Sequence, residues 1–174
     1  MTTALESLLF LAARVLATGA CATAAMDLWA ILLRRAFGLT SLDYALVGRW
    51  LGHMPAGRFA HASIGRASPV SGEKALGWFA HYAIGVGFAA CFVGLAGPAW
   101  WQAPTFAPAL AFGIGTIVVP FFIMQPAFGA GIAASKTPNP TQARLRSLMT
   151  HSVFGLGLYA GGWLVSLAGR AIVD

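Results

Sequence analysis

The stretch ALGWFAHYAIGVGFAACFVGLAG, residues 75–97, decides the fold class because it contains no charged side chain. A helix of roughly 20 apolar residues crosses a hydrocarbon core of about 30 Å. Three further stretches of that kind lie near residues 15–33, 105–134 and 151–169. The chain is 58% hydrophobic and 9% charged, with a mean hydropathy of +0.74. We therefore predict an all-α fold, with residues 1–174 forming one integral membrane domain built as a bundle of four transmembrane helices.

The positive charges are distributed unevenly along the chain. Nine of the 11 lysines and arginines lie in the connections 34–74 and 136–146, whereas the turn at 98–104 has none. The positive-inside rule places both basic connections in the cytoplasm and both termini in the periplasm. Trp100 and Trp101 are then expected in an aromatic belt at the outer interface. This distribution favours a lipid bilayer as the partner and argues against nucleic acid, despite the net charge of +6.

Two segments interrupt the regular helical pattern. The third apolar stretch contains Pro108, Pro120 and Pro126, so we expect this helix to be kinked or broken on its cytoplasmic half. The connection 34–74 is long, but it is rich in aromatic residues and histidines rather than in residues that favour disorder. We predict an ordered cytoplasmic loop, with an interfacial helix over residues 41–51.

Two helices carry the same pattern of histidine, glycine and alanine. Residues 81–90 read HYAIGVGFAA and residues 151–160 read HSVFGLGLYA. The helix before each copy carries a matching pair, Met26–Asp27 in one case and Met124–Gln125 in the other. The pattern predicts two helical hairpins in parallel repeat, related by an axis along the membrane normal.

Polar residues recur at one depth of the predicted bundle. Asp27 lies seven residues before Arg34, and His81 lies seven residues after Lys74, which is roughly 10 Å along a helix in each case. His151 lies five residues after Arg146, or about 7 Å. An aspartate at the centre of a bilayer costs about 2.5–3.5 kcal/mol on insertion scales, so Asp27 should face a partner inside the bundle. Together with Gln125, these residues predict a polar site on the cytoplasmic half.

Several ligands suit such a site. A metal ion would use His81, His151 and Asp27, and haem would use the two histidines as its axial pair. A small polar ligand would contact Asp27 and Gln125, beneath a loop lid that supplies the residues Arg49, His53, Arg58 and His61. Two alternatives remain open: a small-solute or proton-coupled transporter, and a structural or assembly subunit, alone as a homo-oligomer or with a membrane partner. No established catalytic or metal-binding motif occurs, so no catalytic residue is assigned.

The chain resembles a family of small bacterial inner-membrane proteins that is catalogued only as a domain of unknown function. The resemblance rests on the segments MDLWA (26–30), VGRWLGHMPAGRFAH (47–61), GEKALGWFAHYAIG (72–85), PFFIMQPAFGAGIAASKTPNP (120–140) and HSVFGLGLYA (151–160). It implies a protein that crosses the membrane several times, and it implies no activity.

Overall fold

The computed structural model describes residues 4–171, and every regular element in them is helical. Three helices are long and continuous: α1 (Ala4–Phe37), α3 (Glu73–Ala96) and α6 (Pro140–Ala171). The fourth apolar segment, Phe106–Ala127, is divided into shorter elements. All four are long and apolar enough to cross a membrane. The all-α prediction with four candidate spans is confirmed.

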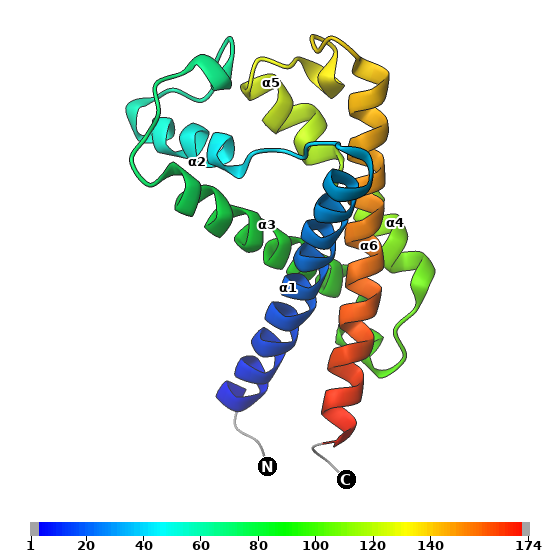
Figure 1. Ribbon diagram of the computed structural model, residues 1–174. Coiled ribbons are helices and arrows are strands. Elements are labelled where there is room, and N and C mark those ends of the chain that lie inside the picture. The colour runs from blue at the N-terminus through cyan, green and yellow to red at the C-terminus, as the bar shows by residue number, and fades with distance from the viewer. Residues whose placement is uncertain (1–3, 172–174) are drawn as a thin grey trace.

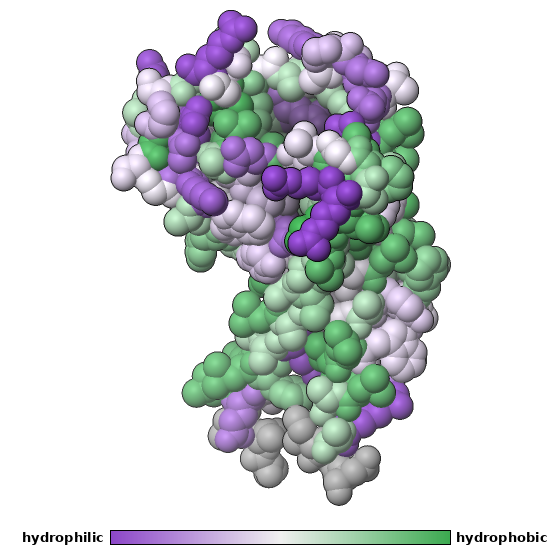
Figure 2. Space-filling view, in the orientation of Figure 1, coloured by the Kyte–Doolittle hydropathy of each residue, from purple (hydrophilic) through white to green (hydrophobic). Residues whose placement is uncertain are grey.

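The four spans place both basic connections at one end of the molecule. Figure 1 shows the first turns of α1 and the last turns of α6 together at the opposite end. Helix α6 packs against α1 on one side and α4 (Phe106–Gly115) on the other, whereas α3 crosses α1 and carries α2 (Tyr44–His53). Figure 2 shows hydrophilic side chains gathered at the end that carries α2 and the connections, above a largely apolar lower body.

The third span is broken where the prolines predict it. Helix α4 ends at Gly115, a π-helical turn covers Pro120–Met124, and α5 (Gln125–Ala127) follows. Proline has no N–H to donate, so a regular α-helix cannot continue through it without losing a bond. The helix ends earlier than the predicted residue 134, because Gly129 and Gly131 adopt positive φ angles of 86° and 76°.

The other predicted helices are longer in the structure. Helix α1 continues beyond residue 33 to Phe37 and ends where Gly38, at φ 65°, donates its N–H to the Arg34 carbonyl. Helix α6 begins at Pro140, where the sequence Asn139–Pro140–Thr141 predicts a helix start ahead of the apolar stretch 151–169. The Asn139 side chain caps it by accepting from the Gln142 N–H at 3.1 Å. The basic segment 140–150 therefore runs straight into the membrane span.

Residues 38–72 form an ordered connection, as predicted. Helix α2 is followed by two 3₁₀ turns, Met54–Ala56 and Ile64–Arg66. The Arg49 guanidinium connects α2 to the second turn and to the start of α3: it pairs with Glu73 at 2.7 Å and donates to the carbonyls of Ile64 and Ala67. Hydrogen bonding to Glu73 raises the pKa of Arg49, so this cation stays charged.

The aromatic belt predicted at residues 100–101 is wrong. Trp100 and Trp101 lie in the short 3₁₀ helix Pro98–Gln102, but only 8% and 2% of their surfaces are exposed. The Trp101 indole N–H donates to Thr18 Oγ1 of α1 at 3.1 Å. Glycine at position 162 leaves room for the Trp100 ring against α6. Both indoles therefore pack inside the bundle, against α1 and α6.

The parallel repeat stays a prediction. Gly85 of α3 packs against Gly19 and Thr23 of α1, and Gly155 of α6 packs similarly against Gly113 of α4. In such a repeat the hairpin α1–α3 corresponds to the hairpin α4–α6, so the α1–α6 and α4–α3 contacts would be equivalent. They are unequal, because α1 contacts α6 extensively whereas α3 touches α4 at few positions.

Candidate functional site

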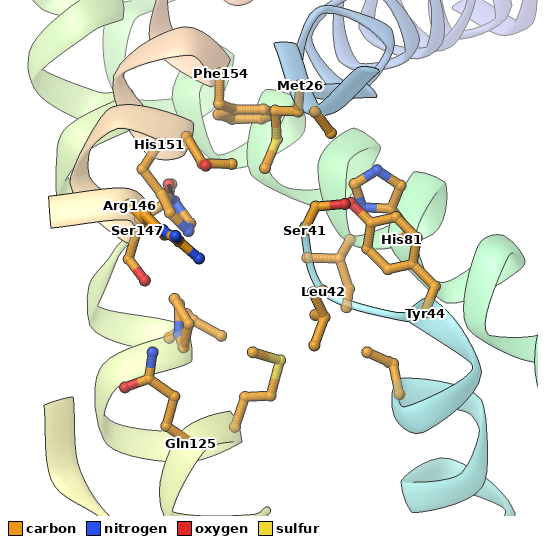
Figure 3. A pocket seen from close by; sticks show the side chains of 18 of the residues that line it. Met26, Ser41, Leu42, Tyr44, His81, Gln125, Arg146, Ser147, His151 and Phe154 are labelled. Carbon is orange, nitrogen blue, oxygen red and sulfur yellow. Dashed lines mark hydrogen bonds between the residues drawn. The ribbon is translucent and has the colours of Figure 1, made fainter. Parts of the chain in front are cut away.

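A cavity of about 430 Å³ lies between the α1–α2–α3 side of the molecule and the α5–α6 side. Figure 3 shows His81 and Tyr44 on one wall, His151, Arg146 and Gln125 on the other, and Phe154 with Met26 at one end. Its size falls within the range of about 300–1,000 Å³ typical of small-molecule sites. Most of its lining residues are apolar or aromatic, and none is an aspartate or glutamate.

Helix α6 supplies a continuous face to this cavity. The lining residues recur three, four or five positions apart, which places them on one side of the helix. They are Ala143, Arg146, Ser147, Thr150, His151 and Phe154. This face changes from polar near the start of α6 to apolar at Phe154, so the cavity has a polar end and an apolar end.

One wall contains the hydrogen-bonded group predicted around Asp27. His81 Nε2 lies 3.0 Å from Asp27 Oδ1, and the Tyr82 hydroxyl donates to Asp27 Oδ2 at 2.8 Å. A carboxylate only accepts, so the Nε2 atom of His81 carries the proton. The Tyr44 ring stacks on the imidazole with 4.0 Å between ring centroids. Burial, and secondarily the Asp27 charge, raises the pKa of Tyr44, which keeps its hydroxyl protonated.

The opposite wall orients His151. The Thr116 hydroxyl donates its proton to the Gly113 carbonyl at 2.6 Å, so its oxygen accepts from His151 Nδ1 at 2.7 Å. The Nε2 atom of His151 therefore keeps its lone pair in the neutral ring, and no residue in 4–171 bonds to it. Both cavity histidines are thus held in one orientation by a partner from another helix, each with one ring nitrogen left for a ligand.

Three polar groups that line the cavity have no partner among residues 4–171. The Trp29 indole nitrogen and the Gln125 Oε1 atom are buried without a hydrogen bond. The Arg146 guanidinium, half-buried on the cavity wall, makes no hydrogen bond or ion pair within the described chain. Buried polar groups are normally satisfied, so an unpaired set around one cavity is the arrangement expected of a site without its ligand.

The structure separates the residues predicted for the lid from the cavity. Arg49 is used in the loop, as described above, and Arg58 is exposed. His53 Nδ1 lies 2.8 Å from His61 Nε2, so these two histidines bond to each other. None of the four residues lines the cavity; α2 covers it instead with Tyr44, Val47 and Trp50.

The metal hypothesis gains no support from the donor geometry. Nowhere in residues 4–171 do three side chains of His, Cys, Asp or Glu gather closely enough to hold an ion. The Asp27 carboxylate is occupied by His81 and Tyr82, so of this pair only the Nδ1 atom of His81 is left for a ligand. His151 lines the same cavity from α6 and has Thr116 as its partner.

Sequence reasoning missed five residues of the site: Trp29, Tyr44, Tyr82, Thr116 and Arg146. Only Arg146 left a usable signal, because it lies on the same helical face as His151 once α6 is extended to Pro140. The others are set by tertiary contacts between helices far apart in sequence, which no local pattern reports.

The fold and this cavity define the class: an all-helical membrane protein with four apolar helices long enough to span a bilayer and a cavity between them. Residues 16–165 match the family described as Protein of unknown function (DUF2938), and the chain belongs to that family. No curated protein and no solved structure matches the chain.

Proposed function

We propose that this protein binds a small, largely apolar molecule inside the cavity, with a polar group of that molecule held by α5 and α6. The observation that carries the proposal is the combination of an apolar lining with three unpartnered polar groups, Trp29, Gln125 and Arg146. Such a site gains affinity from apolar burial and orientation from a few polar contacts.

The extent of the cavity favours binding over transport through the bundle. Its lining ends at Thr23, Phe88 and Phe154. Beyond them the helices are closed by a packed cluster that includes Phe92, Trp101 and Leu158, each 2% exposed or less. A through-path would need polar or open space in this half. A purely structural subunit would need no cavity at all.

Thermal unfolding tests the proposal. Undecanoate should raise the unfolding midpoint of the wild-type protein saturably in a two-chain maltoside detergent, because ligand binding to the folded state stabilises it by about 2.7 kcal/mol at 100 times its Kd. Ala143→Phe places a ring in the cavity and should lose most of that rise. Ala83→Phe adds the same ring on the exposed side of α3 and should keep it. An equal rise in both variants, or none in the wild type, would count against the cavity as the binding site.

We further propose that the protein lies in the bacterial inner membrane with both termini in the periplasm. Nine basic residues in the two connections support this orientation, while Arg14 and Arg170 lie near the terminal end. Reporter fusions after Asp174 should be active only as periplasmic reporters, and insertions at Ser63 only as cytoplasmic ones. A cytoplasmic signal after Asp174 would overturn the orientation.

A further inference from the structure

We infer that the ligand is a single-chain amphiphile with an anionic head group, a carboxylate or a phosphate monoester, and that Arg146 binds that head; this inference rests on the proposed function. The cavity contains one permanent cation, Arg146, and no acidic residue lines it. A half-buried arginine on a cavity wall without a counter-charge is unfavourable, and Arg pairs bidentately with carboxylates and phosphates. The missing partner of this guanidinium is therefore an anion.

The polar atoms around Arg146 match the same head group. Ser147 and Thr150 on α6 add hydroxyl donors to this end of the cavity, and Gln125 adds an amide. The Trp29 indole N–H is buried without an acceptor. These donor groups, beside an unpaired arginine and with no carboxylate among them, suit an oxygen-rich anion.

The opposite end of the cavity fits an apolar chain. Phe154 lies eight residues beyond Arg146 on α6, about 12 Å farther along the helix axis at 1.5 Å per residue. Met26, Phe88 and Phe154 enclose this end. A volume of about 430 Å³ lies near the small end of ligand cavities, which favours one chain over the two chains of a membrane phospholipid.

The rim of the cavity gives such a molecule a route from the bilayer. Ile84 of α3 and Ile123 of the π-helical turn line the cavity, yet 46% and 54% of their surfaces are exposed. An exposed apolar rim in a membrane-spanning region opens toward lipid chains rather than toward water. An amphiphile dissolved in the membrane can thus enter the cavity through this rim with its apolar chain leading, and its head group then lies beside the polar face of α6.

Quenching of tryptophan fluorescence tests the inference, because Trp29 and Trp50 line the cavity. The probes are ω-bromoundecanoate and its uncharged analogue ω-bromoundecanol, whose bromine atoms quench nearby indoles. Quenching in the cavity-filled Ala143→Phe variant gives the background from probe dissolved in the detergent. The carboxylate should quench the wild type saturably above that background and more tightly than the alcohol.

The variant Arg146→Gln separates charge from shape. It should weaken binding of the bromocarboxylate about 10- to 100-fold, the usual effect of one charged hydrogen-bonding partner, and leave the alcohol unchanged. Arg35→Gln removes a charge from an exposed position at the end of α1 and should leave both probes unchanged. Undecyl phosphate should compete with the carboxylate, whereas inorganic phosphate should not.

The possible outcomes distinguish the two proposals. Equal affinity for acid and alcohol, unaffected by Arg146→Gln, would overturn the anionic head and leave the binding cavity standing. Competition by inorganic phosphate as strong as that by undecyl phosphate would overturn the apolar chain. Saturable quenching by neither probe would overturn both the inference and the proposed function.

Discussion

Gly155→Leu is expected to abolish most of the folded protein, because the α4 and α6 backbones touch at this position. A Cβ atom added at Gly155 would lie 2.8 Å from the Leu110 Cα atom and 2.9 Å from the Ala109 carbonyl oxygen. Real side chains do not come this close to a backbone, so the helices must separate. In a bilayer, helices associate through this kind of close packing of small residues.

The expected loss is large for a single substitution. Overpacking typically costs about 1–3 kcal/mol when only side chains must move, so displacing a backbone should cost about 3 kcal/mol or more. Separating α4 from α6 would also pull Thr116 from His151, and binding should fall with stability. Folded yield by size-exclusion chromatography and the unfolding midpoint in detergent measure the effect.

Gly87→Leu is the matched control for this change. Gly87 lies on the exposed side of α3, and nothing occupies the space within 4 Å of its added Cβ atom. It should therefore retain nearly wild-type yield. If Gly155→Leu were as stable as Gly87→Leu, the close contact between α4 and α6 would be wrong.

Asp27→Ala is the second substitution with a large expected effect. This substitution leaves the His81 N–H and the Tyr82 hydroxyl without their shared acceptor. Only 9% of the His81 side chain is exposed, so solvent cannot easily replace that acceptor. A buried donor left unpaired costs about 1–3 kcal/mol, so the free energy of unfolding should fall by about 2–5 kcal/mol. Thermal unfolding in detergent measures it.

Two further variants make the reason for that loss clear. Asp27→Asn keeps one carbonyl acceptor and removes a buried charge, so it should cost less than Asp27→Ala. Asp43→Ala removes an aspartate that caps α2 at an exposed position, where about 1 kcal/mol is typical. An Asp27→Ala protein as stable as the wild type would mean that the Asp27–His81–Tyr82 contacts do not hold the bundle.

The sequence predicts the framework of this protein better than its site. Apolar length alone located the four spans, and Pro120 and Pro126 located the break in the third. The ends of α1 were less predictable, because Glu6 and Arg14 lie in the helix and interrupt the apolar pattern without ending it. The burial of Trp100 and Trp101 depends on Thr18 and Gly162, which are distant in sequence.

The candidate site illustrates the same limit. The similar depth of Asp27, His81 and His151 predicted a partner for Asp27 among the histidines or the loop arginines, and the structure pairs it with His81. Sequence reasoning could not find Thr116 as the partner of His151, since a hydroxyl in an apolar helix carries no charge pattern. It also assigned the lid to Arg49 and His53, whose side chains instead hold the loop together.

Native mass spectrometry of the intact protein measures directly how many amphiphile molecules each chain binds in this cavity. With undecanoate present, the account predicts one tightly held ligand on each wild-type chain and on Ala83→Phe, and none on Ala143→Phe. Wild-type chains that carry no ligand, or Ala143→Phe chains that carry as much as the wild type, would contradict it.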